Sequence, residues 1–130
     1  MHPEWKAKVA AEIQALLAKH TNTDAPLHDR LASIPLSVWE TELPMIDAVL
    51  RETQRLTMGS TALRRNLGDA VKVDNKIIRT GDFLAYPLAD VHANPDIYSE
   101  PMKFDPLRFD LGREEDKKAP MAFLGWGAGA

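Results

Sequence analysis

The sequence contains no cysteine among its 130 residues. This absence excludes disulfide bonds and every thiolate metal site built from this chain alone. The histidines do not replace such a site, because His2, His20, His28 and His92 are scattered without the spacing typical of metal ligands. The sequence therefore predicts no metal site made by its own side chains.

Long apolar runs and an excess of basic residues are also missing. No apolar run approaches the ~18 residues needed to cross a bilayer, and the start, MHPEWKAKVAAEIQ, is charged and amphipathic, unlike a secretory signal. The formal net charge is −3 and no basic stripe appears, which argues against a nucleic-acid partner. With 45% apolar and 27% charged residues, the composition is that of an ordinary globular domain. We expect no membrane segment in this chain and no nucleic-acid partner.

What the sequence does contain is a helical first part. Its apolar residues recur every three or four positions, which is the period of an amphipathic helix. Pro3 suits a first helical turn, and the SVWE run that begins at Ser37 has the form of a capping box. These signals predict helices at about 3–20, 27–34 and 37–56. The last of these contains the strongest apolar stripe.

The period changes after residue 58. Alternating residues flank Asp74-Asn75, which predicts a β-hairpin region at about 70–86. Prolines then recur from 87 to 120 and forbid long helices, and GREEDKK at 112–118 has the mixed charge of a solvated loop. The expected fold class is mainly α with a small β-hairpin or sheet (α+β), in a single domain.

Two short motifs could bring charged residues together. Glu52 and Arg55, in ETQR, lie three positions apart on one face of the predicted helix. They could form an exposed ion pair worth a few tenths of a kcal/mol. Arg108 lies in the proline-stiffened MKFDPLRFD segment, either as a surface residue or as a buried fork that needs a carboxylate. Because one carboxylate can accept several hydrogen bonds, Glu52, Arg55 and Arg108 would form a coherent buried triad.

The sequence given ends on FLGWGAGA, where glycines alternate with larger residues from Gly125 onwards. Glycines at this density allow positive φ angles or a close approach to a flat ligand. Together with ETQR at 52–55 and the F-x-P-x-R-F segment at 104–109, in this order, this loop resembles the cytochrome P-450 family of haem-thiolate monooxygenases. The run HANPDIYSEPMKFDPLRF at 92–109 resembles the eukaryotic microsomal branch, and most of all its fungal, sterol-demethylase-like members.

The resemblance covers nearly the whole chain and implies a fragment of the cytochrome P-450 fold. In this family a loop of the form F-x-x-G-x-R-x-C-x-G presents a cysteine thiolate to the haem iron. Trp126 takes the place of the leading aromatic residue, so the cysteine is expected roughly three residues beyond Ala130. The chain is then expected to be one partial domain over 1–130, a C-terminal-half fragment that ends just before the ligand.

The same resemblance assigns roles to single residues. Glu52, Arg55 and Arg108 would be structural, and Arg64, Trp126, Gly127 and Gly129 would line the cofactor. Arg64 would reach a haem propionate, although Arg64 and Arg65 could also be an ordinary surface pair at the start of a strand. We expect no catalytic residue in this chain.

For the parent protein, the resemblance implies a monooxygenase that binds haem b and inserts one oxygen atom of O2 into a small apolar substrate, such as a sterol-like one. Electrons would come from an NADPH-dependent reductase, and the parent would lie at the endoplasmic reticulum membrane. Two alternatives stay open. The chain could be an inactive truncated product or decoy without haem, or an unrelated helix-plus-hairpin interaction module.

Overall fold

The computed structural model describes residues 2–22, 24–125 and 127, which form two compact units, Met1–Glu52 and Thr53–Ala130. Each unit is described here by itself, and the expectation of one partial domain stays a prediction. The elements are helix-rich with a small antiparallel sheet, which confirms the expected fold class. Within the described residues, none of the helices has the length and apolar character that a bilayer crossing requires.

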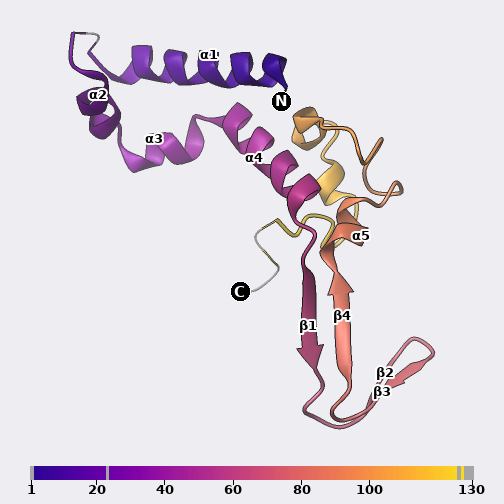
Figure 1. The fold of residues 1–130 in the computed structure, drawn as a ribbon. Helices are drawn as coiled ribbons and strands as arrows, with labels where there is room; N and C mark the ends of the chain where they lie inside the picture. Colours follow the sequence, from indigo (N-terminus) through magenta and orange to yellow (C-terminus); the bar gives the residue numbers. More distant parts are fainter. Residues whose placement is uncertain (1, 23, 126, 128–130) are drawn as a thin grey trace. The chain divides into compact units, whose positions relative to one another are not determined.

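The first unit is helical (Figure 1). It contains α1 (Pro3–His20), α2 (Leu27–Ser33), α3 (Leu36–Thr41) and the greater part of α4 (Pro44–Thr57). Pro3 occupies the first turn of α1, where its missing N–H costs no hydrogen bond. Apolar side chains from all four helices or the residues beside them form one core: Leu16, Leu17, Ile34 and Leu43, with Ile13, Val38, Trp39 and Ile46 packed against them.

The structure divides the helix expected at 37–56 into α3 and α4. Pro44 begins α4, because a proline has no N–H to donate and is tolerated only in the first turn. The amides that follow donate instead to a side chain of α1. Met45 N–H reaches Glu12 Oε1 at 2.8 Å, and Ile46 N–H reaches Glu12 Oε2 at 2.9 Å. A carboxylate in this position also suits the positive end of the helix dipole.

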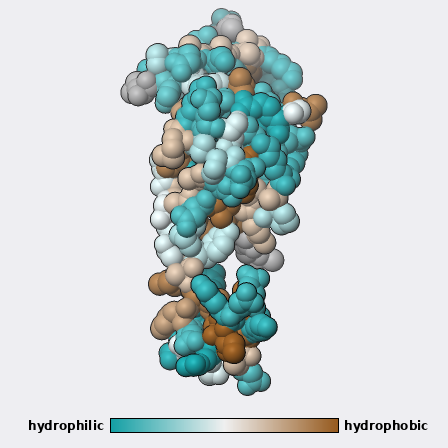
Figure 2. Space-filling model, turned by 90° about the vertical axis from the view of Figure 1, so that its right-hand side faces the viewer, coloured by the Kyte–Doolittle hydropathy of each residue, from teal (hydrophilic) through white to brown (hydrophobic). Residues whose placement is uncertain are grey.

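The second unit contains a β-ribbon and a largely irregular segment. β1 (Thr61–Arg65) pairs antiparallel with β4 (Phe83–Pro87), and β2 (Val71–Val73) pairs with β3 (Lys76–Ile78) through a turn in which Asp74 has φ 50° (Figure 1). The expected hairpin is therefore present at β2–β3, whereas the pairing of β1 with β4 was not predicted. Apolar side chains of this ribbon stay exposed, among them Val71, Val73, Ile77 and Phe83. Brown hydrophobic atoms lie beside hydrophilic ones in the lower part of Figure 2.

After β4 the chain forms α5 (Leu88–His92) and two short 3-10 helices, η1 (Pro106–Phe109) and η2 (Glu115–Lys117). The buried residues of this segment include charged and polar side chains, among them His92, Arg108 and Glu115. The expectation that 112–118 is simply a solvated loop is wrong at Glu115, whose exposed fraction is 4%. The reason is a set of hydrogen bonds that no local pattern reveals.

Candidate functional site

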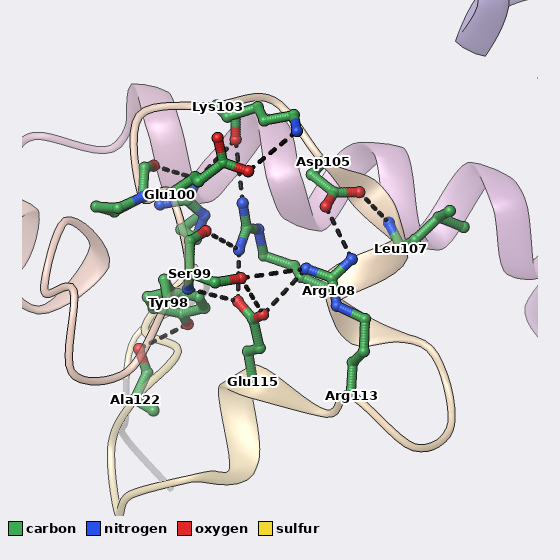
Figure 3. A network of polar contacts seen from close by, with 12 residues as sticks. Tyr98, Ser99, Glu100, Lys103, Asp105, Leu107, Arg108, Arg113, Glu115 and Ala122 are labelled. Carbon is green, nitrogen blue, oxygen red and sulfur yellow. Dashed lines mark hydrogen bonds and ion pairs between the residues drawn. The ribbon is translucent and has the colours of Figure 1, made fainter.

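Arg108 lies at the centre of a polar network in the second unit (Figure 3). It is carried by η1, whose first turn is capped by the Asp105 carboxylate accepting from the Leu107 amide. Its Nη1 donates to Glu115 Oε2 at 2.5 Å and to the Ser99 carbonyl at 3.2 Å, and its Nη2 donates to the Lys103 carbonyl at 3.1 Å. The guanidinium is fully buried, so these charge-assisted bonds are shielded from water.

Glu115 supplies the carboxylate that Arg108 contacts, and sequence reasoning did not name it. Its oxygens also accept from the Ser99 amide at 3.1 Å, the Ser99 hydroxyl at 2.6 Å and Arg113 Nη2 at 3.0 Å (Figure 3). Burial alone raises the pKa of Glu115, but the hydrogen bonds from Ser99, Arg113 and Arg108 outweigh burial and lower this pKa to about 2. The carboxylate is therefore charged at every ordinary pH.

Arg55, on α4, is the second buried arginine, with an exposed fraction of 2%. Its Nη1 donates to the His92 carbonyl at 2.5 Å, and its Nη2 donates to the Pro101 carbonyl at 2.6 Å. Arg55 and Arg108 share one aromatic neighbour: their guanidinium carbons lie 4.9 Å and 5.6 Å from the centroid of the Tyr98 ring. The ring face attracts both cations, as in other buried cation–π contacts.

Glu52 lies one turn before Arg55 on the same helix and is also fully buried. The burial of Glu52, Arg55 and Arg108 does not fit the alternative of a solvent-exposed ion pair on α4. The structure brings Arg55 and Arg108 together on Tyr98. The role of the three residues as a single triad stays a prediction.

The segment 122–124, which leads into the glycine loop, is held by buried side chains. The Tyr98 hydroxyl donates to the Ala122 carbonyl at 2.9 Å, and the Leu124 amide donates to His92 Nε2 at 3.0 Å. The Phe123 ring stacks on His92 with centroids 5.7 Å apart and meets Phe109 edge-on at 5.6 Å. His92 has a lowered pKa because of its burial and the nearby Arg55 charge.

The two described glycines of the loop differ in their surroundings. At Gly125 an added Cβ would collide with the Phe123 ring and would lie 2.6 Å from Gln54 Oε1, so no larger residue fits without a shift. Gly127 has φ +89° and open space around the position of a Cβ, a conformation that favours glycine. The predicted cofactor residues Trp126 and Gly129 lie outside the described residues.

Arg64 and Arg65 take different positions on β1. Arg64 is exposed and donates to the carbonyl of its neighbour Leu63 at 2.9 Å. Arg65 donates to the Gly81 carbonyl at 3.3 Å and lies over the Phe83 ring at 5.6 Å. The guanidinium of Arg65 is thus bound to the ribbon itself, and Arg64 stays the predicted propionate ligand.

Comparisons with known proteins agree with this geometry. The family model described as Cytochrome P-450 matches residues 1–130. The chain is 39% identical to cytochrome P-450 monooxygenase AacuE of Aspergillus aculeatus and 38% identical to cytochrome P-450 monooxygenase nsrP of Aspergillus novofumigatus. These alignments cover 98% and 99% of the chain but 26% of each relative, so the chain spans about a quarter of their length. Both relatives are fungal, in line with the resemblance seen at 92–109.

A solved structure gives the same fold. The structure described as retinoic acid bound cyanobacterial CYP120A1 superposes with a TM-score of 0.72 at 24% identity, over 98% of this chain and 26% of that one. At this identity the likeness shows the fold alone. The family model and the fungal relatives show more: the chain belongs to the cytochrome P-450 family.

Proposed function

We propose that the full-length protein, meaning the longest natural polypeptide that contains residues 1–130, is a haem-dependent monooxygenase. It inserts one oxygen atom of O2 into a small apolar organic substrate. The observation that carries the proposal is the buried arginine pair on Tyr98, whose hydroxyl in turn holds the segment that leads into the glycine loop. The fungal relatives named as monooxygenases support it.

The described residues fit the surroundings of a haem but not the ligation of its iron. Gly127, with its positive φ and open Cβ position, allows close passage of the backbone beside a flat ring. Arg64 offers an exposed, planar guanidinium of the kind that pairs with a propionate. Because the chain has no cysteine, a thiolate ligand must come from outside these residues. When bound, the haem supplies the oxygen chemistry, and thiolate ligation favours cleavage of the O–O bond.

Within the proposal, residues of this chain bind and orient the haem, and none of them takes part in the chemical step. The proposed triad has a structural role: it stabilises the fold beside the cofactor. Its members are Glu52, Arg55 and Arg108. Arg64, Trp126, Gly127 and Gly129 line the cofactor itself. None of these residues is assigned a proton transfer.

The finer parts of the proposal rest on the resemblance to eukaryotic microsomal members. They are haem b as the cofactor, an NADPH-dependent reductase as the electron donor, the endoplasmic reticulum membrane as the location, and a sterol-like compound among the apolar substrates. An unrelated interaction module is no longer a candidate, because the family model matches the whole chain.

Product analysis tests the proposed activity. The full-length protein is incubated with a microsomal reductase, NADPH, isotopically heavy oxygen gas and a panel of apolar compounds that includes sterols. We expect a product of at least one compound to carry a single heavy oxygen atom, formed only when NADPH and reductase are present. A haem-loaded protein that accepts electrons but labels no compound, sterol or otherwise, would contradict the proposed reaction.

A further inference from the structure

We propose that His92 and Tyr98 are positioning residues that fix the backbone path of residues 122–124, directly before Gly125. The inference rests on the proposed function only where it links this path to haem binding. The contacts themselves belong to the second unit and involve described residues alone. Neither side chain was assigned such a role by the sequence motifs.

Each of the two hydrogen bonds satisfies one polar group of the segment's backbone, a carbonyl at one end and an amide at the other. Tyr98 donates its hydroxyl proton to the Ala122 carbonyl at 2.9 Å, and His92 Nε2 accepts the Leu124 amide proton at 3.0 Å. Both side chains are buried, with exposed fractions of 0% and 1%. Without these partners, the carbonyl and the amide would be buried and unsatisfied, which is costly.

The imidazole of His92 is needed as a hydrogen-bond acceptor as well as for packing. To accept the Leu124 proton, Nε2 must be unprotonated, so the neutral ring carries its proton on Nδ1. Within the described part of the chain, that buried Nδ1 has no hydrogen-bond partner. A phenylalanine would stack on Phe123 equally well without burying an unpaired donor. The hydrogen bond that His92 accepts from the Leu124 amide explains why an imidazole lies here.

His92 and Tyr98 also connect the segment to the arginine pair. The Tyr98 ring lies within 4.9 Å of the Arg55 guanidinium and 5.6 Å of the Arg108 guanidinium. Arg55 Nη1 donates to the His92 backbone carbonyl at 2.5 Å. The arginines are therefore linked to segment 122–124 through these two residues.

Conservative substitutions in the full-length protein test this assignment. Tyr98→Phe removes only the hydroxyl, and His92→Phe keeps a stacking ring but removes the acceptor. His92→Gln returns an acceptor near the position of Nε2. The matched control is Tyr86→Phe, because Tyr86 is the other tyrosine and is exposed on β4.

Amide hydrogen exchange, measured with and without haem, reports the backbone directly. We expect exchange at Leu124 to become about tenfold faster in His92→Phe, since one hydrogen bond is lost, and to return toward normal in His92→Gln. In Tyr98→Phe the neighbouring amides should exchange faster. In Tyr86→Phe nothing should change.

The absorption spectrum of the reduced, carbon monoxide-bound protein reports the cofactor. We expect Tyr98→Phe and His92→Phe to move part of the red-shifted thiolate band to the position of haem without thiolate. Unchanged Leu124 exchange in His92→Phe, or an undiminished thiolate band when exchange is faster, would overturn the inference. If His92→Phe does not fold, Tyr98→Phe carries the same test. A wild-type protein without any thiolate band would instead overturn the proposed function.

Discussion

At the scale of single residues, the charge balance around Arg108 depends on Glu115. The carboxylate meets two guanidinium groups, Arg108 and Arg113, and two donors of Ser99 while it is almost completely buried (Figure 3). A buried charge that keeps its partner is tolerated, whereas one that loses its partner is strongly destabilising. Glu115 is therefore a charged partner of the buried Arg108, although it lies outside the sequence motifs.

Substitution of Glu115 by glutamine removes this charge with little change of shape. We expect Glu115→Gln to lower the free energy of unfolding of the full-length protein by about 3 kcal/mol, because Arg108 stays buried beside a neutral amide. Denaturation in urea measures the loss. The matched control is Glu114→Gln, whose ion pair with Lys117 is exposed at the lysine and should be worth at most about 1 kcal/mol. Equal losses in the two variants would contradict the buried-pair account.

The lowered pKa of Glu115 also gives a pH dependence with a defined sign. A carboxyl whose pKa falls from 4.5 to about 2 on folding contributes stability above pH 4.5 and loses it as the pH falls toward 2. The gap in stability between wild type and Glu115→Gln should therefore narrow over that window. His92, whose pKa is lowered below 6.5, also destabilises the fold on acidification, but both proteins share this loss. A gap that stays constant between pH 5 and pH 3 would show that the carboxyl is not held in its charged form.

At the scale of elements, the position of α4 is important for the proposed triad because this helix carries Glu52 and Arg55. Its N-terminal amides at Met45 and Ile46 donate to Glu12, a residue of α1. Substitution of a helix cap typically costs ~1 kcal/mol. The start of α4 is thus fixed by a neighbouring helix, not by its own sequence alone.

We expect Glu12→Ala to lower the free energy of unfolding by about 1 kcal/mol, since two amides at the helix start lose their acceptor. Glu12→Gln, which keeps one acceptor oxygen, should lose less. Thermal or urea unfolding of the full-length protein measures both. Glu40→Ala, at an exposed position on α3, serves as control. If Glu12→Ala behaves like this control, the carboxylate does not hold the helix start.

Elements formed by local patterns could be predicted from the sequence, and elements formed by distant partners could not. Helical spacing predicts a helix at about 3–20, where the structure has α1, and Asp74-Asn75 predicts the turn between β2 and β3. The pairing of β1 was not predicted because its partner, β4, lies almost twenty residues further along the chain. For Arg108 the sequence left a surface residue and a buried guanidinium open, and the structure buries the side chain. Glu115 was not predicted because GREEDKK has the composition of a surface loop, whereas the contacts from Ser99 and Arg108 form only when the chain folds.

At the scale of the whole molecule, the chain leaves large apolar side chains exposed. They occur on α2, α3, α4 and the β-ribbon, and include Leu27, Leu36, Leu50, Leu63, Ile77 and Phe83. The chain also spans only 26% of the fungal relatives. We infer that other parts of the full-length protein cover some of this apolar surface.

Residues 1–130 in isolation should therefore bind a hydrophobic dye and associate as their concentration rises. Dye fluorescence and light scattering measure the two effects, and the full-length protein at equal molar concentration is the comparison. Sharp near-ultraviolet dichroism from the three tryptophans without dye binding would show instead that these residues form a self-sufficient domain.

The proposed function requires that this chain support a haem whose thiolate ligand lies outside it. The most direct measurement is the absorption spectrum of the reduced, carbon monoxide-bound protein, taken for the full-length protein and for residues 1–130 after both are supplied with haem. We expect the red-shifted Soret band of thiolate ligation in the full-length protein and no such band in residues 1–130, which contain no cysteine. A thiolate-type band from residues 1–130 alone, or its absence from a folded, haem-loaded full-length protein, would contradict the account.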